Sequence, residues 1–251
     1  MTTPAWSQIE ALVNNVHGWT PIDQLFALYT LTLATAGLSG DIVEVGSWCG
    51  RSAVVLASAA RSTGGAKVHC VDLFPARDDW KQNPDGTYSF DMVIDGKRYV
   101  GYQEQTVWKE AFESQTSKIY ETYDSVYDCF RETVAARGLD DVVMAHRGDL
   151  GSLLAKRGPD FQCRLAFLDG DHGYEAVRED IQNIDRHLVP GGWLCFDDAF
   201  TVYDGVSRAI SELVIDNPEY EHCQQMTRKL FVARKKATGT AQTKVGGISH
   251  E

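Results

Sequence analysis

The sequence predicts a doubly wound α/β fold built on a mostly parallel, seven-stranded sheet. Short apolar, β-branched segments alternate with helical segments, and acidic residues directly follow several of the predicted strands. Such alternation implies right-handed crossovers and therefore parallel strands. We divide the chain into an N-terminal helical layer (1–37), the sheet domain (38–236) with an inserted lid (73–138), and a disordered tail (237–251).

The first segment, 5–37, has apolar residues at helical spacing. Thr20 suits the N-cap of its second helix, with Pro21 as the first helical residue. This layer either covers the sheet or pairs two subunits. The apolar positions are Ile9, Leu12, Val13, Val16, Leu25, Leu28 and Leu31.

The sheet domain supplies the strands and helices in alternation. The predicted strands are 42–45, 67–71, 142–145, 165–168 and 193–196, and the predicted helices are 52–61, 150–156, 174–188 and 205–215. Segments 220–225 and 229–234 are close enough to form an antiparallel hairpin that finishes the sheet.

The interval between Asp72 and Val142 is far longer than the roughly 10–15 residues that a plain crossover helix needs. It is rich in aromatic residues and contains turn signals at 84–86 and 95–96. We therefore expect an inserted lid after the second strand. Its aromatic side chains either close over a substrate or form the lid's own core or a subunit interface.

Composition excludes several classes of function. The net charge of -11 disfavours a nucleic-acid partner. No apolar run approaches the roughly 20 residues that span a bilayer, and the N-terminus does not resemble a secretory signal, so we expect a cytoplasmic protein without membrane contact. The scattered cysteines fit a reducing compartment.

The first predicted strand ends in Glu-Val-Gly-Ser-Trp-Cys-Gly, residues 44–50. The chain leaves the strand through Gly46 and enters the helix through Gly50. Trp48 stands where a dinucleotide-binding loop has the glycine that lets the backbone approach a pyrophosphate. The loop therefore favours a nucleoside cofactor without a pyrophosphate, although a structural turn of an α/β domain is the alternative.

Carboxylates also follow the second and third strands. Asp72 is placed to accept hydrogen bonds from ribose hydroxyls or to cap a lid helix. Asp149 is placed to accept from an adenine amino group or to cap the helix that begins at Leu150. Both fall at the carboxyl ends of predicted parallel strands, which is where open α/β sheets bind ligands.

These motifs resemble those of the Rossmann-like class I S-adenosylmethionine-dependent methyltransferases over about residues 40–235. EVGSWCG is similar to their first motif, VDLF to their second-strand acid and GDL to their adenine-side acid. The resemblance implies S-adenosylmethionine as cofactor, with Glu44 near its methionine end and Asp72 on the ribose. The implied cofactor-binding set is Glu44, Gly46, Ser47, Gly50, Ser52, Asp72, Leu73, Asp149, Leu150 and Asp169.

A second acidic group follows the next two strands. Asp169 and His172 follow one strand, and Asp197 and Asp198 follow the other. Adjacent strand ends lie about 5 Å apart, and clustered carboxylates repel one another unless protons or a cation neutralise them. Oxygen ligands suit Mg²⁺, Mn²⁺ or Ca²⁺. In the alternative without a metal, Asp171 caps the helix near Tyr174, Asp198 is a turn residue and His172 is solvated or capping.

This spacing resembles that of the metal-dependent O-methyltransferases of the catechol and macrocin-like types. The resemblance implies Mg²⁺ or Mn²⁺ on Asp169, Asp197 and Asp198, with His172 as general base. The phrases DGDHGYE and PGGWLCFDD favour the macrocin-like type, in which the base is histidine, whereas the lid matches neither type.

We therefore expect an S-adenosylmethionine-dependent O-methyltransferase of secondary metabolism, acting with a metal ion on a hydroxyl of a small, sugar-like or otherwise hydroxylated acceptor. Neutral imidazole takes a hydroxyl proton near neutral pH, and chelation acidifies that hydroxyl. Two alternatives stay open, a metal-independent N- or C-methyltransferase and a non-catalytic nucleoside-binding domain. A homo-oligomer also stays open, because the N-terminal helices either cover the sheet or pair two subunits.

Overall fold

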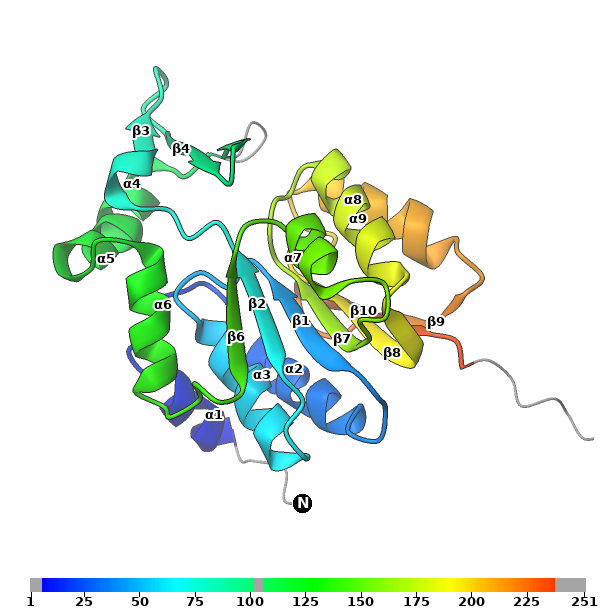
Figure 1. Ribbon diagram of the computed structural model, residues 1–251. Coiled ribbons are helices and arrows are strands. Elements are labelled where there is room, and N and C mark those ends of the chain that lie inside the picture. Colours follow the sequence, from blue (N-terminus) through cyan, green and yellow to red (C-terminus); the bar gives the residue numbers. More distant parts are fainter. Residues whose placement is uncertain (1–5, 102–105, 238–251) are drawn as a thin grey trace, which may run out of the picture.

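The computed structural model describes residues 6–101 and 106–237 and confirms the predicted fold (Figure 1). Its main sheet has the strand order β6-β2-β1-β7-β8-β10-β9, in which β10 is antiparallel to both of its neighbours. The strands are β1 (Asp41–Val45), β2 (Val68–Asp72), β6 (Val143–Arg147), β7 (Cys163–Leu168), β8 (Leu188–Phe196), β9 (Tyr220–Gln225) and β10 (Phe231–Lys235).

The strand order reverses at β1, because β2 and β6 lie on one side of it and β7 and β8 on the other. The crevice at the carboxyl ends of the strands on either side of such a switch point is where doubly wound sheets bind ligands. The predicted strand-end residues therefore meet at one edge of the sheet.

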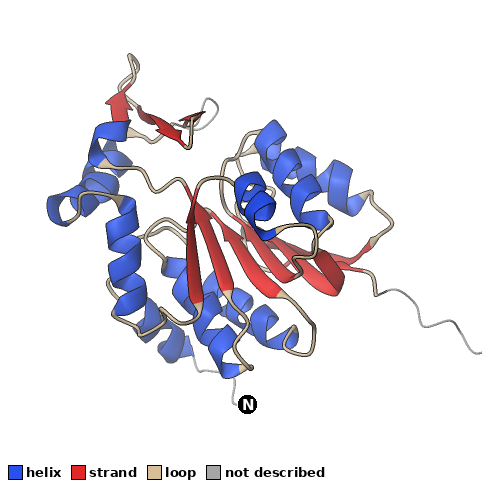
Figure 2. Cartoon of the chain, viewed as in Figure 1, coloured by secondary structure: helices blue, strands red, loops and turns tan. Residues whose placement is uncertain are grey.

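Helices cover both faces of the sheet (Figures 1 and 2). One face packs against α1 (Trp6–Val13), α2 (Ile22–Ala34), α3 (Arg51–Ser62) and α6 (Val126–Ala135). The other face packs against α7 (Leu150–Arg157), α8 (Tyr174–Asp185) and α9 (Asp204–Ile210). The π segment η3 (Ser211–Ile215) continues α9. Alternate strand residues enter the two cores, with Ile42 and Phe167 on one side and Val43 and Leu168 on the other.

Two predicted helix boundaries were wrong. The helix assigned a Thr20 cap begins at Ile22, because Pro21 is extended (ψ 159°) and itself holds the N-cap position. The helix predicted to reach residue 188 ends at Asp185, and β8 begins at Leu188, ahead of the predicted residue 193. The N-terminal layer covers the sheet, with Ile9, Leu25 and Leu28 buried in this chain's own core.

The insertion after β2 folds over the carboxyl edge of the sheet (Figure 1). It begins with the 3₁₀ turn η1 (Arg77–Asp79) and an antiparallel sheet of β3 (Trp80–Gln82), β4 (Tyr88–Ile94) and β5 (Lys97–Val100). Then follow α4 (Lys109–Ala111), the π segment η2 (Phe112–Thr116), α5 (Ser117–Thr122) and α6. Both predicted turns are present, with Gly86 at φ +87° and Gly96 at φ +82°.

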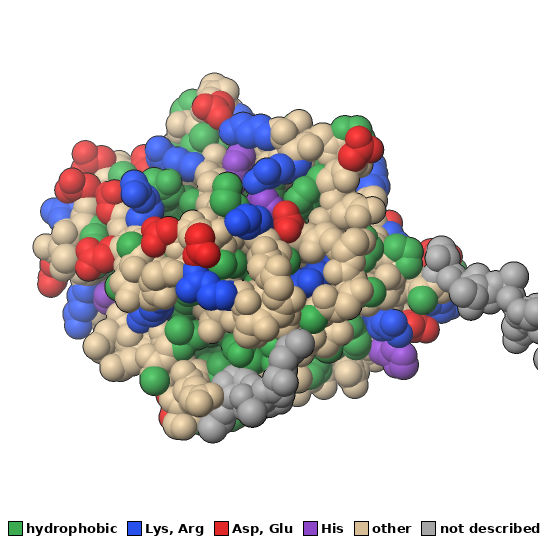
Figure 3. All heavy atoms as spheres, turned by 60° about the horizontal axis from the view of Figure 1, so that its bottom comes forward, with side chains coloured by type: hydrophobic (Ala, Val, Ile, Leu, Met, Phe, Trp, Pro, Cys, Tyr) green, Lys and Arg blue, Asp and Glu red, His purple; other side chains and the backbone are tan. Residues whose placement is uncertain are grey.

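The surface carries both acidic and basic side chains (Figure 3). On the face in Figure 3, basic and acidic side chains are interspersed and no continuous basic area appears. In the described parts of the chain, no helix has the length and apolarity that crossing a bilayer requires. The predicted tail lies almost wholly outside the described residues.

Candidate functional site

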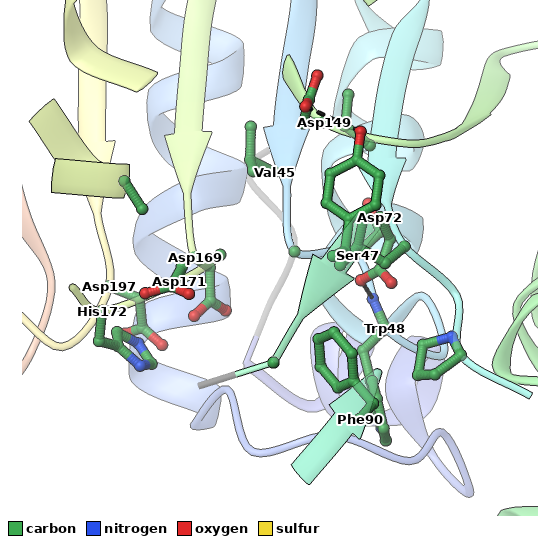
Figure 4. A pocket seen from close by; sticks show the side chains of 18 of the residues that line it. Val45, Ser47, Trp48, Asp72, Phe90, Asp149, Asp169, Asp171, His172 and Asp197 are labelled. Atoms are coloured by element: carbon green, nitrogen blue, oxygen red, sulfur yellow. Dashed lines mark hydrogen bonds between the residues drawn. The ribbon is translucent and has the colours of Figure 1, made fainter. Parts of the chain in front are cut away.

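A cavity of about 660 Å³ lies between the carboxyl ends of the sheet strands and the lid (Figure 4). Most of the predicted site residues line it. They are Gly46, Ser47, Ser52, Asp72, Leu73, Asp149, Leu150, Asp169, His172, Asp197 and Asp198. Glu44 and Gly50 do not line it. The volume is within the range of cofactor and substrate sites.

Gly46 directly follows β1, at a place where an added side chain does not fit. Its φ is +87°, and a Cβ at this position would lie 1.8 Å from the carbonyl oxygen of Asp169. The loop after it continues through Trp48, whose φ is +47°. The absence of a side chain at Gly46 thus brings the ends of β1 and β7 together.

Asp72, at the end of β2, points into the cavity (Figure 4). Its Oδ2 accepts a hydrogen bond from the Trp48 amide at 2.8 Å, and its Oδ1 accepts one from the Phe74 amide at 2.6 Å. Burial raises the pKa of Asp72, and these two amides partly offset that rise. The carboxylate keeps further lone pairs with which to accept from hydroxyl groups of a ligand.

Glu44, the last residue but one of β1, is fully buried. Among the described residues, no group makes a hydrogen bond of normal geometry with either of its carboxyl oxygens. Burial raises the pKa of Glu44, and the nearby Ser47, Ser52 and Cys70 side chains reduce that rise. The residue lies behind the cavity wall that Ser47 and Ser52 form.

Asp149 joins the sheet domain to the lid. Its Oδ1 accepts from the Ser152 amide at 2.7 Å and so caps α7. Its Oδ2 accepts from Lys97 Nζ at 2.5 Å and from the Tyr99 hydroxyl at 2.9 Å, both on β5. Burial tends to raise the pKa of Asp149, but these hydrogen bonds outweigh it and lower the pKa to about 2.

The aromatic side chains of the lid pack against one another, and some of them also line the cavity. Trp80 packs edge-on against Phe90 and Phe112, with ring centroids 5.5 and 5.3 Å apart, and Tyr88 stacks on Phe112 at 3.8 Å. These rings form the lid's own core. Trp80 and Phe90 also line the cavity, as does Trp108, which is 71% exposed.

The second acidic group converges across the cavity from Asp72 (Figure 4). His172 Nε2 lies 3.2 Å from Asp198 Oδ2, and the imidazole stacks on the Tyr203 ring with centroids 4.2 Å apart. Within the described chain, neither imidazole nitrogen makes a hydrogen bond of normal geometry. Asp171 accepts from the Gly173 amide at 2.6 Å, and Gly173 holds the N-cap position of α8.

Two residues in this group were not predicted. Lys229, from the loop between β9 and β10, places its Nζ 2.8 Å from Asp197 Oδ2 and 3.4 Å from Asp198 Oδ1. Gln24, from α2, donates from Nε2 to Asp197 Oδ1 at 2.7 Å. Burial tends to lower the pKa of Lys229, but the charges of Asp197 and Asp169 raise it.

The three carboxylates differ in their surroundings. Burial and the charge of Asp197 raise the pKa of Asp169 well above its ordinary value. Burial also tends to raise the pKa of Asp198, but His172 and Lys229 outweigh it and lower the pKa. The group therefore combines one carboxyl that holds a proton readily with a charged carboxylate beside the imidazole.

A family model described as methyltransferase domain matches residues 43–199, more than half of the chain. The chain belongs to the methyltransferase domain family. The matched span runs from β1 to just beyond Asp198 and includes the lid. The prediction of an S-adenosylmethionine-dependent methyltransferase is confirmed.

Solved structures of O-methyltransferases share the methyltransferase fold. NovP is 16% identical with a TM-score of 0.61, over 88% of this chain and 83% of NovP. The Bacillus cereus enzyme, solved with SAH, is 15% identical with a TM-score of 0.56, over 93% and 92% of the two chains. CalS11, a calicheamicin methyltransferase, is 15% identical with a TM-score of 0.57, over 91% and 90%.

The donor chemistry of the methyltransferase's acidic group fits a hard divalent cation. All three predicted ligands are carboxylates, and Gln24 Oε1 is a fourth oxygen beside Asp197, fully buried and without a partner among the described residues. As they stand, the described residues include no group of three acidic, His or Cys side chains close enough together to hold an ion. The Lys229 ammonium lies between Asp197 and Asp198 and pairs with both.

Proposed function

We propose that this methyltransferase transfers the methyl group of S-adenosylmethionine to a hydroxyl oxygen of a small molecule, with His172 as general base. The observation that carries the proposal is the position of His172. Its imidazole lines the cavity beside Asp198, across from the Asp72 side, and has unused hydrogen-bonding capacity. NovP and CalS11, which share the fold, are an O-methyltransferase and a calicheamicin methyltransferase.

When bound, S-adenosylmethionine supplies an electrophilic methyl group. His172 accepts the proton of the acceptor hydroxyl while the hydroxyl oxygen forms its bond to that methyl carbon. The electron pair of the broken carbon–sulfur bond stays on sulfur, so the products are a methyl ether and the thioether S-adenosylhomocysteine. Asp198 orients the imidazole and stabilises the imidazolium that forms, and Tyr203 supports the ring by stacking.

We also propose that Asp169, Asp197 and Asp198 hold Mg²⁺ or Mn²⁺. When bound, the cation would lower the pKa of a chelated hydroxyl. The oxygen-only donor set and the buried, unpartnered Gln24 Oε1 support this part of the proposal.

The acceptor we propose carries a ring, either a sugar or an aromatic group of a secondary metabolite. Trp19 and Trp48 line the cavity with ring centroids 5.5 Å apart, and Trp108 adds an exposed indole on the lid side. Indole faces pack well against sugars and aromatic rings. CalS11 is described as a TDP-rhamnose 3'-O-methyltransferase, which supports the sugar-like acceptor.

The test is a turnover assay with a panel of glycosides and phenols, read by mass spectrometry of the product. His172→Gln should lower kcat by roughly 100-fold or more while leaving the affinity for S-adenosylmethionine unchanged. His222→Gln is the matched control, because His222 is exposed on β9 and does not line the cavity. Methylation at nitrogen or carbon, or full activity in His172→Gln, would contradict the proposal.

The cation is tested separately. Chelation with EDTA should lower the rate for the wild-type enzyme, and added Mg²⁺ or Mn²⁺ should restore it. A rate that persists undiminished in EDTA would remove the cation from the proposal and leave the His172 chemistry intact.

A further inference from the structure

Lys229 is a cation that the chain itself supplies to the acidic group. Its side chain is 13% exposed, and the two carboxylates that it contacts, Asp197 and Asp198, are 3% and 18% exposed. At such low exposure solvent screens the attraction weakly, so the contacts are strong. Lys229 therefore neutralises part of the charge that three neighbouring carboxylates bring together.

The chain's own groups occupy all four oxygens of this carboxylate pair. Gln24 Nε2 and Lys229 Nζ donate to the two oxygens of Asp197. Lys229 Nζ at 3.4 Å and His172 Nε2 at 3.2 Å contact the two oxygens of Asp198. A divalent cation needs oxygens of the same carboxylates within about 2.0–2.6 Å. An ammonium group at its present position and the ion would repel each other at contact distance.

The Lys229 side chain is able to leave while its backbone stays. The Lys229 carbonyl accepts a hydrogen bond from the Ala199 amide at 3.0 Å, which fixes the loop against the end of β8. The flexible four-carbon stem of lysine lets the ammonium swing toward the cavity that the side chain already lines.

We propose that the Lys229 ammonium holds the cation position of the acidic group and leaves it when a divalent ion binds. The inference rests on the cation part of the proposed function. Lys229 then weakens the affinity for the ion, and it keeps Asp197 and Asp198 together when no ion is bound. Removing its charge should strengthen ion binding and destabilise the ion-free protein.

The experiment is isothermal titration of Mn²⁺ into the full chain at constant ionic strength, comparing the wild type with Lys229→Met. The variant should bind Mn²⁺ roughly tenfold more tightly or better. Lys235→Met is the matched control, since Lys235 lies on the same hairpin and pairs with Asp185 at 3.1 Å, away from the cavity. Its affinity for Mn²⁺ should equal that of the wild type. An affinity in Lys229→Met that is unchanged or weaker would overturn the inference.

Three further variants test the same interpretation. Combining Lys229→Met with Asp197→Asn should abolish the gain in affinity, and a gain that survives would place the ion elsewhere and overturn the inference. If circular dichroism shows that Lys229→Met does not fold, Lys229→Gln replaces it with the same expected gain. Lys229→Arg keeps the charge and should bind Mn²⁺ no more tightly than the wild type.

Binding of S-adenosylmethionine, titrated in the same samples, separates this inference from the proposed function. A wild-type protein that fails to bind it would contradict the proposed function, whereas the comparison of Mn²⁺ affinities would still decide the role of Lys229.

Discussion

At Gly46 the missing side chain sets the distance between two strand ends. We expect Gly46→Ala to lower the free energy of unfolding by roughly 3 kcal/mol or more, because its Cβ would lie 1.8 Å from the Asp169 carbonyl oxygen at a φ of +87°. Urea denaturation measures this loss. Gly86→Ala is the control, since Gly86 has the same φ of +87° with nothing within 4 Å of an added Cβ. It should lose only about 1 kcal/mol. Equal losses would show that the contact with β7 has no energetic role.

Asp149 shows what a local sequence pattern predicts and what it misses. The sequence offered two roles for Asp149, and the structure shows the capping role together with a contact to the lid. Its role toward an adenine stays a prediction. Lys97 and Tyr99 were not predicted, because their partner lies 52 and 50 residues along the chain and no periodicity links them.

At the scale of elements, the β4–β5 hairpin docks on the N-terminus of α7 through Asp149. The pKa of Asp149 is lowered to about 2, below its ordinary value of 3.8. A lowered pKa means that the docking contact contributes stability at neutral pH. The contribution is lost as the pH falls from about 4 through about 2.

We expect Lys97→Met to increase hydrogen exchange of the backbone amides of β4 and β5 by roughly two- to fivefold at pH 7, because Lys97 is largely exposed and such pairs contribute modestly. The difference from the wild type should shrink as the pH falls toward 2, after correction for intrinsic exchange. Lys81→Met is the control, since Lys81 pairs with Asp91 inside the same small sheet, at 2.7 Å. Exchange that rises equally in both variants would show that the hairpin does not dock through Asp149.

At the scale of the whole molecule, the sheet brings two half-sites to one edge. The loop after β1 and the ends of β2 and β6 supply the half that contains Asp72 and Asp149. The ends of β7 and β8 supply the half that contains Asp169, His172, Asp197 and Asp198. The cavity joins the halves, and the methyltransferase family model spans both.

The strand-end acids were predictable because parallel strands place their carboxyl ends at one edge, and strand positions follow from local apolar runs. Gln24 was not, because it reaches Asp197 across 173 residues from a helix whose pattern indicates only packing. Lys229 was not predicted either, because it lies 32 residues from Asp197 in the loop between β9 and β10, where no pattern links it to the acidic group. Contacts of this kind depend on the packing of elements and leave no local signal.

The most direct test of the account is isothermal titration of S-adenosylmethionine into the wild type and Asp72→Asn. The wild type should bind one molecule per chain. Asp72→Asn should bind roughly 100-fold more weakly, because it loses the carboxylate that we predict accepts hydrogen bonds from the ribose hydroxyls. Asp141→Asn is the control, an exposed carboxylate that pairs with Arg61 away from the cavity, and it should bind like the wild type. Absence of binding by the wild type, or equal affinity in Asp72→Asn, would contradict the assignment of this cavity as the cofactor site.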